Sequence, residues 1–211
     1  MKKYEKRLTI PPLNSIISLY FKRLGVDLKM AQKRTQKLAF AALFGALAFA
    51  ATMVAFPAPL VGNVNLGDCI ILIAAWLPLE PWSIFAVAIG PTFADLAAGY
   101  GIYAPATFVI KALMVTVAVL IKRGMPKLPT LWRALLSGVA AEFVMVSGYF
   151  IYEVFLYEAG AALLNISFNL VQGGIAIAAA ILLSFVLSRM PLPEVLRSQG
   201  TLFGKGFAKK K

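Results

Sequence analysis

Six apolar stretches separated by short polar segments form the main pattern of the sequence. They cover residues 38–55, 69–79, 81–98, 104–121, 134–157 and 161–188. Most of them approach the ~20 residues that an α-helix needs to cross the hydrocarbon core of a bilayer. With 60% hydrophobic residues and a mean hydropathy of +0.80, the chain has more apolar surface than a soluble domain of its size can bury. The pattern predicts an all-α integral membrane protein, a single bundle of six transmembrane helices.

The positions of the basic residues predict the orientation of these helices. Of the 21 Lys and Arg residues, ten lie in residues 2–37, four in residues 122–133 and six in residues 189–211. Cytoplasmic segments carry an excess of Lys and Arg. Residues 77–81 could form a kink in one long helix or a turn between two short ones, and only the turn puts all three basic segments on one side. We therefore predict six spans with both termini in the cytoplasm.

This topology divides the chain into three regions. They are a basic N-terminal segment of residues 1–37, a membrane domain of residues 38–190 and a basic tail of residues 191–211. In the first region the apolar residues recur at helical spacing, at Leu13, Ile16, Ile17, Tyr20, Phe21 and Leu24. The segment is therefore either an amphipathic helix on the membrane surface or an irregular tail. Because the basic residues avoid the spans, the net charge of +12 indicates membrane orientation and not nucleic-acid binding.

Ten polar residues within or beside the spans are candidates for binding a small molecule, and most belong to the outer half of the predicted bundle. They are Asn65, Asp68, Asp95, Tyr103, Lys111, Tyr149, Glu153, Asn165, Asn169 and Gln172. The last three recur at i, i+4 and i+7, which places them on one face of a helix. The set predicts a cup that opens outward. Trp76, Trp82 and Trp132 lie near the predicted inner boundaries, where we expect interface anchors.

Two of the charged candidates have a structural and a functional interpretation. An isolated charge deep in a span costs roughly 3 kcal/mol or more, so we expect Lys111 to pair with Asp95 or Glu142. This pair either fixes the register of the helices or places Lys111 at the floor of the cup. Asp68 either caps the start of a helix or contacts the ligand.

Several kinds of chemistry are absent from the sequence. One cysteine and no histidine exclude an intramolecular disulfide and a thiolate or imidazole zinc cluster. We also find no glycine-rich nucleotide loop, no Ser-His-Asp set and no paired metal carboxylates. We therefore predict no catalytic residue, no metal and no cofactor. The absence of an internal repeat argues against a transporter built from two inverted halves.

A stripe of small residues marks the first span. Ala42, Ala46 and Ala50 recur every fourth residue. Small residues at this spacing let two helices approach closely in lipid. The stripe either docks a partner helix or packs within the same bundle.

Three segments resemble the substrate-binding S components of energy-coupling factor (ECF) transporters, in the branch of the riboflavin and hydroxymethylpyrimidine transporters. They read VNLGDCIILIAAWLPLEPW, AIGPTFADLAAGY and IYAPATFVIKALM, and the resemblance covers roughly residues 36–190. It implies six helices in a bacterial cell membrane and an outward-facing site for a water-soluble vitamin. It also implies docking through the alanine stripe onto a transmembrane T component that carries two cytoplasmic ATPases.

The resemblance leaves the vitamin open among riboflavin, vitamin B6-like compounds and hydroxymethylpyrimidine. Two other functions also remain open. The intramembrane charges would suit a self-sufficient proton-coupled carrier. A membrane-embedded enzyme using Asp68, Asp95 and Glu142 as acid and base is the third hypothesis, against which the lack of histidine counts.

Overall fold

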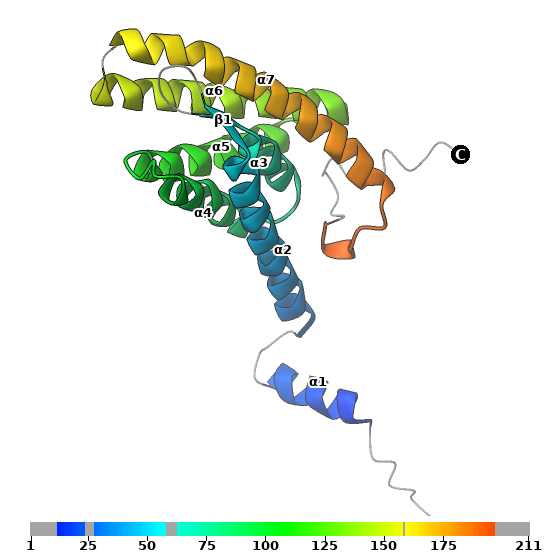
Figure 1. Cartoon of the computed structure of the whole chain (residues 1–211). Coiled ribbons are helices and arrows are strands. Elements are labelled where there is room, and N and C mark those ends of the chain that lie inside the picture. The colour runs from blue at the N-terminus through cyan, green and yellow to red at the C-terminus, as the bar shows by residue number, and fades with distance from the viewer. Residues whose placement is uncertain (1–11, 24–27, 58–62, 158, 197–211) are drawn as a thin grey trace, which may run out of the picture. The chain divides into compact units, whose positions relative to one another are not determined.

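The computed structural model describes residues 12–23, 28–57, 63–157 and 159–196. It divides the chain into two units, Met1–Gln36 and Lys37–Lys211, which are described separately here. Helices make up almost all of the described residues (Figure 1). The three regions predicted from the sequence remain a prediction.

In the first unit, helix α1 spans Leu13–Arg23. Helix α2 spans Leu28–Met53, so it begins in this unit and continues into the second. Helix α1 begins after a proline whose carbonyl oxygen accepts hydrogen bonds from the backbone and the hydroxyl of Ser15. The sequence left open whether this segment is a helix or an irregular tail, and residues 13–23 form a helix. Its apolar Ile16, Ile17 and Tyr20 are exposed. The side chain of Phe21 and all of Leu24 lie outside the described residues, and contact with a membrane surface remains a prediction.

The second unit contains the rest of α2 and five further α-helices. These are α3 (Gly67–Trp76), α4 (Trp82–Ala97), α5 (Ala104–Gly124), α6 (Thr130–Leu156) and α7 (Ala159–Arg189), followed by a short 3₁₀ helix, η1 (Glu194–Leu196). Four of the described helices, α2, α5, α6 and α7, are long and apolar enough to cross a membrane, and α3 and α4 are shorter apolar helices. The chain is thus a multi-pass membrane protein, while the count of six spans and their orientation remain predictions.

The break between α3 and α4 decides the ambiguity at residues 77–81, because the first helix ends at Trp76 and the next begins at Trp82. Glu80 in this turn forms ion pairs with Lys122 at 3.4 Å and with Arg123 at 3.3 Å. The turn and the C-terminal end of α5 therefore lie at the same end of the bundle. The interpretation as a kink in one long helix is wrong.

A short hairpin joins α2 to α3, and the sequence analysis did not predict it. Strand β1 (Ala55–Pro57) pairs antiparallel with β2 (Asn63–Asn65), with Phe56 opposite Val64. Strands of three residues leave almost no periodic signal in a sequence. The hairpin matters for the site because it brings Asn65 to α7.

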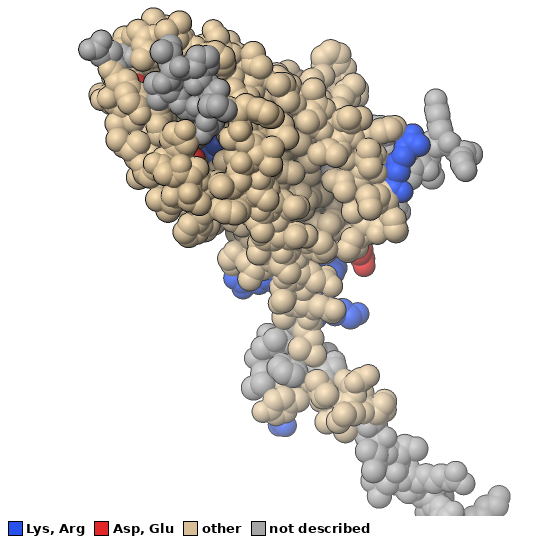
Figure 2. Space-filling model, viewed as in Figure 1, with Lys and Arg blue, Asp and Glu red and all other residues tan. Residues whose placement is uncertain are grey.

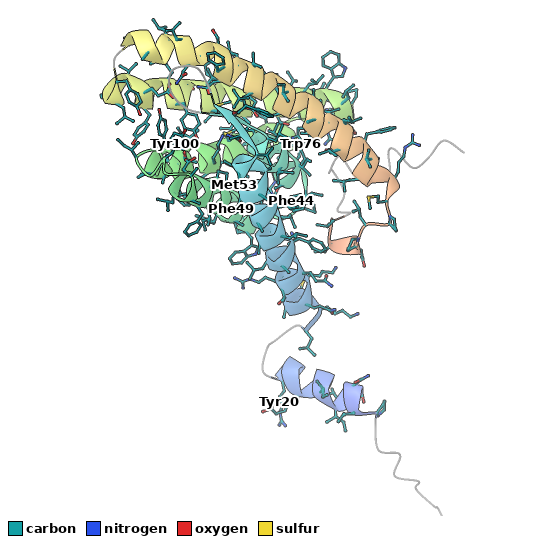
Figure 3. The ribbon with its side chains drawn as sticks, viewed as in Figure 1. Tyr20, Phe44, Phe49, Met53, Trp76 and Tyr100 are labelled. Atoms are coloured by element: carbon teal, nitrogen blue, oxygen red, sulfur yellow. The ribbon has the colours of Figure 1, made fainter. Side chains whose placement is uncertain are left out.

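Helix α3 is the buried centre of the bundle. It contacts α4, α5 and α7, while α5 packs against both α4 and α6, and α6 packs against α7. All but one of the ten residues of α3 are buried, which agrees with a sequence that is apolar on every face of the helix. Trp76 is 0% exposed and its indole N–H donates to Ser137 Oγ at 3.0 Å, inside the bundle (Figure 3). The prediction that Trp76 anchors the membrane interface is therefore wrong, whereas Trp132 is exposed.

Helix α2 approaches α4 so closely that only glycine fits at the contact. A Cβ atom on Gly45 would lie 2.5 Å from the carbonyl oxygen of Ala86, and one on Gly90 would overlap the backbone of Gly45. Such close approach of backbones is the packing mode that small residues permit in lipid.

The alanine stripe of α2 lies beside this contact, on a neighbouring face of the helix. Ala42, Ala46 and Ala50 are exposed, whereas Ala41 and Ala48 are buried. The first two stripe residues border a shallow groove between α2 and α4. Packing of the whole stripe inside the bundle is therefore excluded, and docking of a partner remains a proposal.

The outer surface of the helical body is apolar. Large apolar side chains, including Phe85, Phe143 and Phe155, are exposed on α4 and α6. In Figure 2 the visible face of this body is almost free of Lys, Arg, Asp and Glu. An exposed surface of this composition is suited to lipid and not to water.

Candidate functional site

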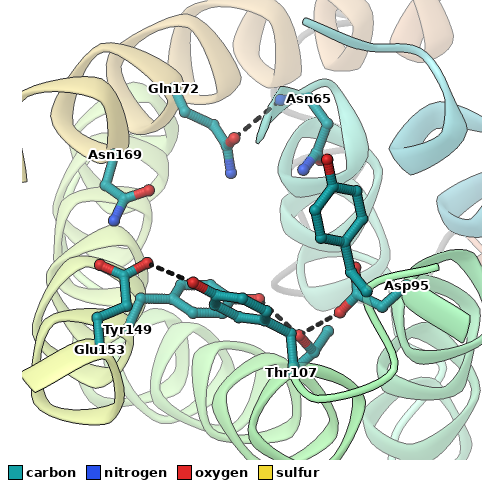
Figure 4. A pocket seen from close by; sticks show the side chains of 9 residues that line it. Asn65, Asp95, Thr107, Tyr149, Glu153, Asn169 and Gln172 are labelled. Carbon is teal, nitrogen blue, oxygen red and sulfur yellow. Dashed lines mark hydrogen bonds between the residues drawn. The ribbon is translucent and has the colours of Figure 1, made fainter. Parts of the chain in front are cut away.

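A small polar cavity lies in the bundle at the end opposite the Glu80 turn. Nine residues line it: Asn65, Asp95, Tyr100, Tyr103, Thr107, Tyr149, Glu153, Asn169 and Gln172. They come from the hairpin, the end of α4, the turn after it, the start of α5, the end of α6 and the first half of α7 (Figure 4). The cavity has a volume of about 60 Å³.

The turn between α4 and α5 shapes one wall of the cavity. Gly99 has a φ of 84°, a conformation that residues with a side chain rarely adopt. The turn then closes with a hydrogen bond from the backbone N–H of Tyr100 to the carbonyl oxygen of Asp95 at 2.8 Å. This tight turn brings the side chains of Asp95, Tyr100 and Tyr103 to the same opening.

Thr107 joins the two sides of the cavity floor. Its hydroxyl donates to Asp95 Oδ2 at 2.5 Å and lies 2.9 Å from the Tyr149 hydroxyl. The ring of Tyr149 also lies over the ammonium group of Lys111, 5.3 Å from nitrogen to ring centroid. Both interactions hold the ring of Tyr149 in place at the floor.

Glu153 occupies the opposite wall. Its Oε1 accepts a hydrogen bond from Asn165 Nδ2 at 3.1 Å and a long one from the Tyr103 hydroxyl at 3.5 Å. Its Oε2 is buried and has no hydrogen-bond partner among the described residues. One carboxylate oxygen is therefore left without a partner in the part of the chain that the structure describes.

An ion pair lies behind the cavity, between α3 and α5. Lys111 Nζ donates to Asp68 Oδ1 at 2.5 Å, and these residues are 3% and 0% exposed. Asp68 Oδ2 accepts a second bond, from Gln172 Nε2 at 2.6 Å. The expectation that Lys111 pairs with Asp95 or Glu142 is wrong, because its ammonium group contacts the carboxylate of Asp68 on α3.

The capping interpretation of Asp68 is wrong as well. Leu66 holds the N-cap position of α3, and Asp68 makes no capping hydrogen bond. The carboxylate of Asp68 instead turns inward to Lys111 and Gln172.

Gln172 links this buried pair to the hairpin. While its amide nitrogen donates to Asp68, its Oε1 accepts the backbone N–H of Asn65 at 2.8 Å. The side chain of Asn65 in turn accepts the backbone N–H of Gly67 at 2.9 Å, at the start of α3. One glutamine therefore fixes the hairpin, α3 and α7 around the cavity.

Glu142 on α6 is a further buried acid near this cluster. It is 5% exposed, and neither of its carboxyl oxygens has a hydrogen-bond partner among the described residues. The backbone of α7 approaches it at Gly173, where a Cβ atom would lie 3.1 Å from Oε2. Glu142 is therefore a buried acid packed closely against α7.

Of the ten candidate residues, seven line the cavity and three do not. Asp68, Lys111 and Asn165 lie buried behind its wall. Two lining residues, Tyr100 and Thr107, were missed as site residues, although both stand in segments that carry the family resemblance. Thr107 could have been found because it follows Tyr103 by one helical turn.

Other predicted features have a clear place in the structure. The Tyr103 ring lies 5.8–6.4 Å, centroid to centroid, from the rings of Tyr149, Tyr152 and Tyr157. The Tyr152 hydroxyl donates to the carbonyl oxygen of Ile102, and this residue does not line the cavity. In the described part of the chain, no group of three His, Cys, Asp or Glu side chains could hold a metal ion.

Comparison with known families matches residues 32–189 to the ECF-type riboflavin transporter, S component. The chain belongs to this family. No curated protein and no solved structure matches the chain. The match covers all six helices of the second unit from within α2 to the end of α7. An ECF S component is a part of a transporter and not an enzyme, which removes the membrane-embedded enzyme from the hypotheses.

Proposed function

We propose that this S component binds a water-soluble vitamin or vitamin precursor from outside a bacterial cell membrane. It delivers this substrate into the cell together with a T component and two ATPases. The observation that supports the proposal most is the polar cavity at one end of an otherwise apolar bundle. Polar side chains are costly in a membrane unless they face a cavity or each other, so their presence there calls for a binding role.

The chemistry of the lining supports a planar ligand. Tyr103 and Tyr149 offer ring faces, while amides and carboxylates at the rim offer directional hydrogen bonds. Aromatic side chains with a few convergent polar groups are typical of sites for small organic molecules. Vitamin B6-like compounds, hydroxymethylpyrimidine and riboflavin all have this planar character.

The cavity is small for a vitamin-sized ligand. Its volume of about 60 Å³ holds a few water molecules. Pockets for drug-sized ligands measure ~300–1,000 Å³. Binding therefore requires side chains or the hairpin to move outward, and the tyrosines of the wall are the side chains that such a movement displaces.

Exposure of the alanine stripe supports the proposed docking of the T component. Ala42, Ala46 and Ala50 leave an exposed, small-residue strip on a helix that is already packed against α4 on another face. A partner helix can approach such a strip to backbone distance. Energy for uphill transport then comes from ATP hydrolysis in the partner subunits, because the S component contains no nucleotide-binding motif.

The test is to identify the small molecule that the protein retains. The chain is purified in mild detergent and extracted, and the extract is analysed by mass spectrometry beside an Asn169→Ala, Gln172→Leu double variant as matched control. We expect one planar vitamin-like compound to copurify with the wild-type protein and to be depleted in the variant. Retention of the same compounds by both proteins would contradict the proposed site.

The runner-up is a self-sufficient proton-coupled carrier. The observation that favours it is Glu142, a buried acid without a hydrogen-bond partner among the described residues. Such a group can exchange a proton during transport. Uptake by vesicles that contain this chain and no ATPase would favour the carrier; dependence on the T component and ATP would exclude it.

A further inference from the structure

The lining of the cavity indicates a narrower class of substrate, an inference that rests on the proposed function. We propose that the substrate is a single-ring aromatic compound with N–H or O–H donors on two opposite edges. It is neutral or cationic and carries no phosphate or carboxylate group.

The first argument is the unpartnered oxygen of Glu153. The residue lines the cavity and is 3% exposed, and its Oε1 already accepts two hydrogen bonds. Its Oε2 has none within the described part of the chain. A buried polar group left without a partner costs about 1–3 kcal/mol, and more when it is charged. A donor on the ligand removes this cost.

Asp95 supplies a second acceptor across the cavity. Its Oδ2 accepts the Thr107 hydroxyl at 2.5 Å, and the residue lines the cavity. Figure 4 shows the carboxyl groups of Glu153 and Asp95 on opposite sides, with the ring of Tyr149 between them. A flat ring lying along Tyr149 would direct its two edges at the two carboxyl groups.

The balance of charge excludes an anionic ligand. No Lys or Arg is among the nine lining residues. Lys111 is not among the lining residues, and its ammonium group is bound to Asp68. A phosphate or carboxylate on the ligand would therefore face two acidic side chains without a compensating cation, which costs several kcal/mol at an interface removed from water.

The dimensions of the cavity favour one ring over three. The Tyr103 and Tyr149 rings, whose centroids lie 6.4 Å apart at an interplanar angle of 49°, bound a space of only about 60 Å³. A single ring can be admitted by a modest rotation of these side chains. A fused three-ring system requires the separation of helices that are already packed through Thr107 and Asn165.

The experiment measures binding to the purified full chain in lipid nanodiscs by isothermal titration calorimetry. The probes are an aminopyrimidine that carries a hydroxymethyl group, pyridoxine, the phosphate ester of the aminopyrimidine, and riboflavin. We expect at least one single-ring probe to bind, and the phosphate ester to bind about 100-fold more weakly than its parent, the equivalent of ~2.7 kcal/mol. Riboflavin should bind more weakly than the single-ring probe.

Two variants test the acceptors, and one tests for a general effect of charge. Glu153→Gln and Asp95→Asn preserve the shape of the side chain and remove a charge. Each should weaken binding of the single-ring probe tenfold or more. Each should also reduce the difference in affinity between the aminopyrimidine and its phosphate ester. Glu194→Gln makes the same change at an exposed position at the start of η1 and should have no effect on binding. Thermal unfolding of each variant verifies that the protein is folded.

The results separate the substrate class from the function. Tighter binding of riboflavin than of both single-ring probes would overturn the proposed substrate class but not the proposed vitamin binding. The same holds if the phosphate ester binds as tightly as its parent aminopyrimidine. Unchanged affinity in both folded acidic variants would also overturn the class. If none of the four probes binds and no small molecule copurifies, both the class and the proposed function are wrong.

Discussion

Substitution of Lys111 by methionine is the sharpest test of how the bundle is held together. Methionine has a similar length but no charge, so the change removes the partner of Asp68 without leaving a large cavity. Asp68 would retain only the hydrogen bond from Gln172 Nε2 at 2.6 Å. A carboxylate that is 0% exposed would then have no cation in contact.

The magnitude follows from the burial of this pair. Removing one member of a buried ion pair destabilises a protein by about 3–5 kcal/mol. For a chain of this size each kcal/mol shifts the unfolding midpoint by roughly 2–4 °C, so we expect a loss of roughly 6–20 °C. Adding Asp68→Asn removes the unpaired charge, and the amide oxygen of the new asparagine can still accept the hydrogen bond from Gln172. The double variant should therefore be about 2 kcal/mol more stable than the sum of the two single effects predicts.

The assay is a double-mutant cycle, read as the thermal unfolding midpoint of protein in detergent. Lys111→Met is combined in turn with Asp68→Asn, Glu142→Gln and Asp95→Asn. We expect the largest coupling with Asp68, the residue in direct contact with the Lys111 ammonium group. Additive losses for the Asp68 combination, or stronger coupling to Glu142, would refute the assignment of the pair.

Three further predictions concern packing, docking and binding. Gly90→Ala should destabilise the protein by about 1–3 kcal/mol in chemical denaturation, because its methyl group would overlap the backbone of α2, whereas Gly174→Ala, with open space around it, should be neutral. Ala46→Leu should leave folding and ligand affinity intact and reduce copurification with the T component; loss of stability in the isolated chain would contradict docking. Asn169→Ala should weaken ligand binding tenfold or more in calorimetry without loss of stability, whereas Gln172→Leu should lower both, since it loses two hydrogen bonds within the protein. Unchanged ligand affinity in both Asn169→Ala and Gln172→Leu would show that the ligand does not bind in this cavity.

The helices could be predicted because each follows from a local pattern. The apolar stretches at residues 104–121 and 134–157 became α5 (Ala104–Gly124) and α6 (Thr130–Leu156), with ends shifted by a few residues. The break at residues 77–81 was decided by charge bias alone, and the pairing of Glu80 with Lys122 agrees with it. The hairpin of three-residue strands has no such pattern and was missed.

Most residues of the candidate site could be predicted from the sequence, but the contacts between them could not. Polar residues in apolar spans are conspicuous because their burial is expensive, and this alone drew attention to Glu153, Asn169 and Gln172. Their roles depend on contacts between distant segments. Gln172, for example, bonds Asp68 and Asn65, more than 100 residues away, and no spacing in the sequence encodes that choice.

By itself the sequence determined that this chain is a membrane protein, approximately where its apolar helices lie, and which residues are too polar to face lipid. These properties depend on hydropathy and on spacing along one helix, so nearby residues contain the information. Only the tertiary structure decided which buried charges meet. Lys111 has three acids in its neighbourhood, and the packing of α3 against α5 selects Asp68, because a strong buried ion pair requires contact and contact is set by how helices cross.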